Sequence, residues 1–174
     1  MQAPGEGPRT LLLDCPELYD RPGIYYDARG DFADNAVRYA FLSAAAIEYA
    51  SQPFDSAHPS TSLGVTLSPS KGQGKQPEPF EIFHAHDWQA GLVPVYQKMH
   101  LSNDPFVGGV PAVFTIHNLA FQGIFPASAL PAIGLGFEVL DVQGLEFWGN
   151  VSYLKGGINF SERITTVSPG YARE

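Results

Sequence analysis

Short runs of apolar residues, each followed directly by polar side chains, constrain the fold of this chain more than any other feature. Runs rich in β-forming residues lie at Phe80–His84, Pro111–Ile116 and Arg163–Val167, and Leu11–Leu13 within Thr10–Asp14 makes a fourth. Their apolar residues are continuous rather than alternating, which is typical of strands buried on both faces of a parallel sheet.

Helix-like segments lie between these runs. Asp34 is a predicted N-cap for a helix over Asn35–Ala50, and Trp88–Met99 predicts a second helix that its internal proline should kink or shorten. Asn150–Phe160 predicts a third, and Ser168 with the following proline suits the start of a fourth. Strands that alternate with helices predict an α/β fold with a doubly wound parallel sheet.

Composition narrows the partners of such a domain. The 174 residues suit a single domain, and their net charge of −8 without a basic run argues against binding to nucleic acid or an anionic membrane. No apolar run approaches the ~18 residues of a membrane span. Cys15 is the only cysteine, so an intrachain disulfide is excluded. The stretch 52–79 is rich in Ser, Pro, Gly and Gln and predicts a flexible, exposed insertion.

Polar clusters follow the predicted strands. His84-Ala85-His86-Asp87-Trp88 comes after one strand, His117-Asn118 after the next and Ser168-Pro169 after the last. In open α/β sheets, ligands bind beyond the carboxyl ends of the strands, so these side chains should converge on one edge. Carboxylate, amide and imidazole groups supply directional hydrogen bonds and Trp offers an apolar face, a combination that suits a sugar.

Each of these residues also has a structural interpretation. His84 fits a buried, hydrogen-bonded strand histidine, Asp87 could cap the following helix, and Trp88 could belong to the core or to a site. His84, His86 and Asp87 also have the spacing of some zinc hydrolase ligands. No dinucleotide-binding or P-loop glycine motif occurs, so phosphates would have to be held by other groups.

Five ordered blocks carry a resemblance to a known family. They are DRPGIYYDARGDFADNAVRYAFLSAAAIEYA, HAHDWQAGLVPVY, PAVFTIHNLAFQGIFP, LEFWGNVSYLKGGI and ITTVSPGYARE, and together they resemble the glycogen and starch synthases. The resemblance covers most of residues 10–174, with the 52–79 insertion unmatched. It implies a retaining glycosyltransferase with the GT-B fold, in which two Rossmann-like domains face each other across a cleft. The implied reaction transfers glucose from ADP-glucose or UDP-glucose to the non-reducing end of an α-1,4-glucan, without a metal or cofactor.

The resemblance also implies what this chain lacks. Family members carry a K-x-G-G loop near the nucleotide and a second domain with the donor-binding residues, and neither is matched here. We therefore expect residues 1–174 to be an incomplete N-terminal domain, with the C-terminal domain absent and no transfer by this chain alone. A non-catalytic α-glucan-binding remnant is the alternative. The bacterial cytoplasm and the plastid stroma both fit, and the cytoplasm is the prediction.

Individual roles follow from the same resemblance. His117 matches a histidine close to the transferred glucose and is the predicted catalytic residue. The predicted substrate-binding residues are Asn118, Asp87, Trp88, Gln89 and Tyr26. Glu146 and Lys155 fall in matching blocks, and packing roles are predicted for both.

Overall fold

The structure is a computed structural model that describes residues 10–51 and 80–173. The predicted flexible insertion at 52–79 lies outside the described residues. The chain divides into two compact units, one up to Phe32 and one from Ala33 onward, and each is described by itself. Among the described residues, no helix combines the length and the hydropathy needed to cross a membrane.

The first unit is small and contains a two-stranded hairpin. Its elements are α1 (Pro16–Tyr19), β1 (Tyr26–Asp27) and β2 (Gly30–Asp31), and the two strands are antiparallel. The predicted strand at 10–14 is wrong, because these residues form no strand and Leu12 is 90% exposed. Apolar composition alone does not make a strand, since a strand also needs a neighbour that pairs with its backbone N–H and C=O groups.

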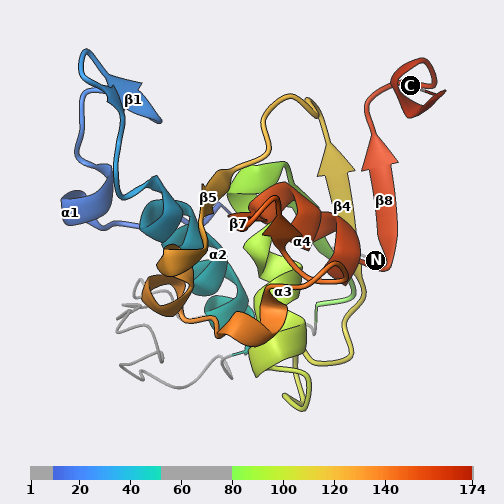
Figure 1. The fold of residues 1–174 in the computed structure, drawn as a ribbon. Coiled ribbons are helices and arrows are strands. Elements are labelled where there is room, and N and C mark those ends of the chain that lie inside the picture. Colours follow the sequence, from blue (N-terminus) through green and yellow to red (C-terminus); the bar gives the residue numbers. More distant parts are fainter. Residues whose placement is uncertain (1–9, 52–79, 174) are drawn as a thin grey trace, which may run out of the picture. The chain divides into compact units, whose positions relative to one another are not determined.

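A three-stranded parallel sheet lies at the centre of the second unit. Its strands are β3 (Phe83–His86), β4 (Ala112–Ile116) and β8 (Arg163–Thr166), in the order β3-β4-β8. Figure 1 shows β4 and β8 side by side, with their carboxyl ends at the same edge. The segments that follow these strands therefore leave the sheet at one edge, where ligands of open α/β sheets bind.

The observed strands confirm the predicted parallel α/β sheet and correct one boundary. The strands predicted at 111–116 and 163–167 are confirmed. The strand predicted at 80–84 begins instead at Phe83, because Phe83 is the first residue that pairs with β4. It continues to His86, so that the residue leaving the sheet is Asp87.

Helices pack beside this sheet. They are α2 (Asn35–Ser51), α3 (Leu92–His100) and α4 (Tyr153–Phe160), and α2 confirms the helix predicted at 35–50. The segment predicted as one helix from Trp88 divides into a 3-10 turn, η1 (Trp88–Ala90), and α3. Pro94 then lies in the first turn of α3, where its missing N–H removes no helical hydrogen bond.

The helix predicted from Asn150 begins later, because its first residues join a second sheet. Asn150–Ser152 form β7, which pairs antiparallel with β5 (Ile124–Pro126) and β6 (Glu146–Phe147) in the order β5-β7-β6. Ser152 then caps α4, and its Oγ accepts a hydrogen bond from the Lys155 N–H at 3.2 Å. The 3-10 segments η2 (Ala127–Ile133) and η3 (Phe137–Val139) connect β5 to β6.

A 3-10 turn, η4 (Tyr171–Arg173), replaces the helix predicted after Ser168. The predicted cap itself is confirmed, since the Ser168 Oγ accepts a hydrogen bond from the Tyr171 N–H at 3.1 Å. The turn follows β8 and so lies beyond the same edge of the parallel sheet as the residues after β4 (Figure 1).

The core of the second unit lies on one face of the parallel sheet. Phe114 on β4 and Tyr153 on α4 are fully buried, and the Tyr153 hydroxyl donates to the Ala36 carbonyl of α2 at 2.9 Å. The predicted burial of the strands on both faces is wrong for β3 and β8. His84 and His86 of β3 and Thr165 of β8 are exposed, so this sheet has one apolar face and one polar face.

A carboxylate fixes β4 at its amino end. The Glu162 side chain accepts hydrogen bonds from the Ala112 N–H and from the Lys98 ammonium, both at 2.6 Å. Partial burial acts to raise the pKa of the Glu162 carboxyl, but these two bonds and the positive charge of Lys98 act against it, and the pKa lies below its ordinary value. The starts of β4, β8 and the end of α3 are thereby joined through one charged group.

Close packing of α4 on the sheet depends on a glycine, which gives a direct test of the fold. A Cβ at Gly157 would overlap the Phe114 ring. We expect Gly157→Ala to lower the free energy of unfolding by about 1–3 kcal/mol through overpacking, although alanine has the higher helix propensity by about 1 kcal/mol. Urea denaturation measures the change. Gly109→Ala is the matched control, because a Cβ there meets nothing within 4 Å, and equal stability of the two variants would contradict this packing.

Candidate functional site

The carboxyl ends of β3 and β4 place Asp87 beside His117. The Asp87 N–H donates to the Thr115 carbonyl at 2.9 Å and so extends the β3–β4 ladder by one residue. The Asp87 carboxylate then accepts from the His117 backbone N–H at 2.8 Å through Oδ1 and pairs with His117 Nδ1 at 2.9 Å through Oδ2. Both oxygens of one carboxylate therefore fix the residue that follows the next strand.

Backbone strain accompanies this contact. Asp87 has φ 56° and ψ 179°, a positive φ that non-glycine residues rarely adopt. Such conformations persist where surrounding contacts hold them, and they gather at functional sites. The interpretation of Asp87 as the cap of the following helix is wrong, because its side chain makes no capping bond to η1. Its carboxylate holds His117 instead.

The Asp87 carboxylate also sets the state of the His117 ring. A carboxylate oxygen accepts only, so Nδ1 carries the proton that lies between the two groups. The neutral ring then presents Nε2, on its opposite side, as a hydrogen-bond acceptor. The His117 side chain is 47% exposed and the Asp87 side chain 29%. The pair thus combines a positioned imidazole with access for a ligand.

Three imidazole rings follow one another on the polar face of the sheet. The ring centroids of His84 and His86 lie 4.1 Å apart, and those of His86 and His117 lie 5.3 Å apart. Partial burial, together with the neighbouring rings of His84 and His117, lowers the pKa of His86 below its ordinary value, against the opposing effect of Asp87. This crowding favours the neutral form of His86 at neutral pH.

The structure does not support a zinc site on β3. His84 Nε2 lies 2.6 Å from the Thr115 hydroxyl, which in turn lies 2.6 Å from the Thr165 hydroxyl. The Asp87 carboxylate is engaged by His117. Within residues 10–51 and 80–173, no three histidine, cysteine or acidic side chains are grouped to hold a metal ion. His84 was also expected to be buried; it is hydrogen-bonded as expected, but exposed.

Trp88 belongs to the core. Its side chain is 8% exposed and packs edge-on against Tyr39, with ring centroids 4.5 Å apart. The Phe125 ring lies 5.9 Å away on another side, and Gly123 leaves room for the indole, which a Cβ at that position would enter. Contact between Trp88 and a substrate stays a prediction, and the observed packing anchors the residue next to Asp87.

Further residues with predicted roles lie on η1, β1, β6 and α4. Gln89 is half-buried, and its carbonyl accepts from the Ser43 hydroxyl at 3.4 Å. Tyr26 is 64% exposed and lies on β1 of the first unit. The packing roles predicted for Glu146 and Lys155 agree with the structure, since the Lys155 ammonium donates to the Glu146 carbonyl at 2.6 Å.

A tyrosine holds the loop that follows His117. The Asn118 Oδ1 accepts from the Ala120 N–H at 2.9 Å and closes a local turn. The Tyr171 hydroxyl accepts from the Leu119 N–H at 2.6 Å and connects this turn to η4. No role was predicted for Tyr171 from the sequence, although the residue lies in the block ITTVSPGYARE that carries part of the family resemblance. Its position just after the Ser168 cap was a further signal that it would lie near the edge where His117 leaves the sheet.

Comparison with known proteins places this arrangement in a family. The family profile described as the starch synthase catalytic domain matches residues 1–174. The chain belongs to the starch synthase catalytic domain family. A glycogen synthase of Roseobacter denitrificans is 44% identical over 171 residues, which are 97% of this chain and 30% of that protein. Glycogen synthase 2 of Bradyrhizobium diazoefficiens is 43% identical over the same shares of the two chains.

A solved structure agrees. The catalytic domain of starch synthase IV from Arabidopsis thaliana, bound to ADP and acarbose, matches with a TM-score of 0.60 and 28% identity. The match covers 82% of this chain and 25% of that one. The α/β fold with a parallel sheet is thus that of a starch synthase catalytic domain, a GT-B glycosyltransferase. This starch synthase-family chain spans about 30% of the length of the curated relatives it matches.

The link between Asp87 and His117 can be tested through the proton on His117. In Asp87→Asn, an amide NH₂ replaces one carboxylate oxygen and cannot accept a hydrogen bond. We expect the neutral His117 ring to change from mainly the Nδ1–H tautomer to a mixture with the Nε2–H tautomer. The ¹⁵N chemical shifts of the ring nitrogens report this change. His100, whose ring lies 2.9 Å from the Gly134 carbonyl, serves as an internal control. An unchanged His117 tautomer in the variant would show that Asp87 does not set it.

The Tyr171 contact can be tested by amide exchange. Tyr171→Phe keeps the ring but removes the acceptor of the Leu119 N–H. We expect Leu119 to exchange about fivefold faster, as for the loss of one hydrogen bond worth about 1 kcal/mol. The Ala120 amide bonds to Asn118 instead and should keep its rate. Equal acceleration of both amides would indicate general loosening of the unit and not loss of this bond.

Proposed function

We propose that this chain forms the acceptor-side part of a glucan synthase, which transfers glucose from a nucleotide sugar to the non-reducing end of an α-1,4-glucan. The Asp87–His117 pair carries the proposal, because it presents a positioned imidazole at the carboxyl edge of a parallel sheet. Membership of the starch synthase family supplies the substrate class. The chain itself contributes the polar edge that a sugar would meet.

His117 is the proposed catalytic residue. With Nδ1–H held by Asp87, Nε2 can accept a hydrogen bond from a hydroxyl of the transferred glucose. Positive charge develops on the sugar ring as the bond to the leaving nucleotide breaks. The Asp87 carboxylate polarises the His117 ring, and the electron-rich Nε2 together with the His117 backbone carbonyl would stabilise that positive charge. The two hydrogen bonds to the Asp87 carboxylate fix the His117 ring and backbone before the substrate binds. Such preorganisation lowers the activation free energy of the transfer.

The other predicted residues have supporting roles in this proposal. Asn118 shapes the turn after His117 and would place polar atoms near the same sugar. Asp87 acts through His117, and Trp88 anchors Asp87 by its packing in the core. Gln89 follows on η1 and would contact the acceptor. Tyr26 is proposed to bind substrate because the family resemblance implies that role.

The donor side is proposed to lie in parts of the relatives that this chain does not cover. Residues 1–174 would then be a partial N-terminal GT-B domain, with the insertion at 52–79 and with the second domain supplied elsewhere in a longer protein. ADP-glucose is the proposed donor, supported by the ADP bound to the matched starch synthase IV, and UDP-glucose is the alternative. The proposed transfer retains the anomeric configuration, needs no metal or cofactor, and takes place in the cytoplasm.

The experiment uses both the 174-residue chain and the longer synthase that carries it. The chain alone should bind maltoheptaose but transfer no glucose from ADP-glucose or UDP-glucose, because a single wall of the cleft cannot exclude water around the reacting sugar.

In the longer enzyme, His117→Ala should lower kcat by about 10²–10³-fold, as for the loss of one preorganised polar group, with a much smaller change in glucan affinity. Radiolabelled transfer and calorimetry measure the two quantities.

Matched controls separate the possible results. His100→Ala removes a histidine at the end of α3 and should leave kcat unchanged. Equal losses of turnover and affinity in His117→Ala would make His117 a binding residue only. Reproducible transfer by the isolated chain would show that it contains its own donor site. If the longer enzyme were inactive but bound glucan, the alternative of a non-catalytic glucan-binding remnant would hold.

A further inference from the structure

The hairpin between β6 and β7 has an unusual residue at its tip. Phe147 of β6 pairs with Asn150 of β7, so that Trp148 and Gly149 alone form the turn. Their φ angles are 51° and 79°. Positive φ at both central residues is typical of a type I′ turn, which normally takes Asn, Asp or Gly at the first of these positions.

Trp148 is therefore in a conformation that its side chain disfavours. A bulky residue at positive φ costs of order 1–3 kcal/mol unless contacts compensate. Here no packing compensates, because Trp148 is 88% exposed and is the most exposed aromatic residue that the structure describes. A bulky residue at positive φ that gains no packing in return indicates a functional role at that position.

The hairpin holds its tip by hydrogen bonds of its own. The Glu146 carboxylate accepts from the Gly149 N–H at 2.9 Å, and the Asn150 amide donates to the Trp148 carbonyl at 3.4 Å. The Lys155 ammonium of α4 donates to the Glu146 carbonyl at 2.6 Å. These bonds fix the backbone at both sides of Trp148, so that the turn from which the indole projects is ordered before a ligand arrives.

We propose that Trp148 is a stacking platform for an α-1,4-glucan, in addition to the contacts assigned above to the predicted substrate-binding residues. The proposal rests on the proposed function, which supplies the glucan. The flat apolar face of an indole packs against the C–H face of a glucose ring, and its N–H can donate to a hydroxyl. The Glu146 and Asn150 side chains flank the turn and offer polar groups to neighbouring hydroxyls.

A sugar fits this tip better than a protein does. Specific protein interfaces bury roughly 800 Å² on each partner and surround their central aromatic residue with further packed contacts. Trp148 follows the half-buried Phe147 and, with Gly149, forms a two-residue turn that leads into Asn150. A single exposed indole at such a narrow turn suits a neutral glucan, which offers one ring at a time.

The two tryptophans of the chain make the site directly measurable. Trp88 is buried and Trp148 is exposed, so maltoheptaose should change the fluorescence of Trp148 and protect it from quenching by acrylamide. Trp148→Gly removes the indole and suits the positive φ, so that its effect on binding cannot come from unfolding. We expect this variant to bind maltoheptaose about tenfold more weakly in calorimetry. Trp148→Phe, which keeps an aromatic face, should retain most of the affinity.

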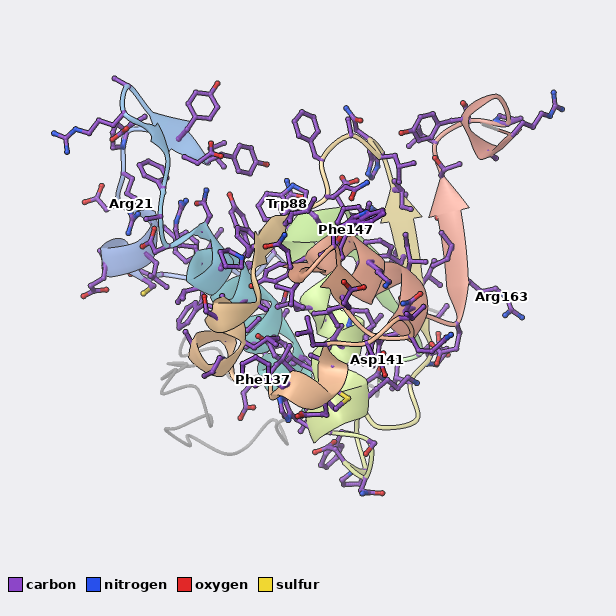
Figure 2. All side chains as sticks on the ribbon, viewed as in Figure 1. Arg21, Trp88, Phe137, Asp141, Phe147 and Arg163 are labelled. Carbon is purple, nitrogen blue, oxygen red and sulfur yellow. The ribbon has the colours of Figure 1, made fainter. Side chains whose placement is uncertain are left out.

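A second exposed aromatic residue supplies the control. Phe137 of η3 is 61% exposed, and Figure 2 shows it well apart from Phe147 and thus from the hairpin. Phe137→Ala should bind maltoheptaose as the unaltered chain does. If the chain binds maltoheptaose and Trp148→Gly binds it equally well, this proposal alone is overturned.

Two further outcomes are distinct. If the unaltered chain binds no maltoheptaose, the proposed function is overturned, and the glucan site at Trp148 with it. If Trp148→Gly converts a dimer to a monomer in sedimentation while glucan affinity is unchanged, Trp148 mediates contact between copies of the chain, and the glucan proposal is again overturned.

Discussion

The parallel pairing of β3 with β4 is the constraint on which the site depends. Register places His86 opposite Thr115, and the Asp87 N–H continues the ladder for one residue beyond the strand. From there, the Asp87 carboxylate reaches both the backbone and the ring of His117. At the other end of β4, the Glu162 carboxylate fixes the backbone in the same way, because it accepts a hydrogen bond from the Ala112 N–H. Carboxylates thus hold β4 at both ends, and the packing of α4 against Phe114 holds its middle.

Some aromatic residues of the second unit pack in its core, whereas Trp148 is exposed at the surface. Tyr39 and Phe125 both pack against Trp88 and keep the start of η1 in place, directly after Asp87. Trp148 has no such enclosure and is held only through its backbone. The same residue type therefore serves as interior support at one position and as a presented surface at another, and the difference lies in whether neighbouring elements cover it.

Much of the fold could be predicted from local sequence, but less of the candidate site could be predicted in this way. The apolar run at 111–116 and the alanine-rich segment at 35–50 contain enough local information to predict β4 and α2. The position of Asp87 and His117 at strand ends was also predictable. The partner of Asp87 was not, because a helix cap is a local choice, whereas the bond to His117 depends on the register of a strand far along the chain. The β6–β7 hairpin was missed for a related reason, since Trp-Gly is not a typical turn pair.

The polar face of the parallel sheet has a consequence for how this chain can vary. On the apolar face, Phe114 and Gly157 constrain each other sterically, so that a change at one requires a change at the other. On the polar face, His84 and His86 are exposed, and the contacts of their rings are with the Thr115 hydroxyl and with neighbouring imidazoles. Substitutions on that face would remove hydrogen-bonding groups without opening a cavity in the core. The two sides of one strand therefore respond differently to substitution, through packed volume on one side and through polar contacts on the other.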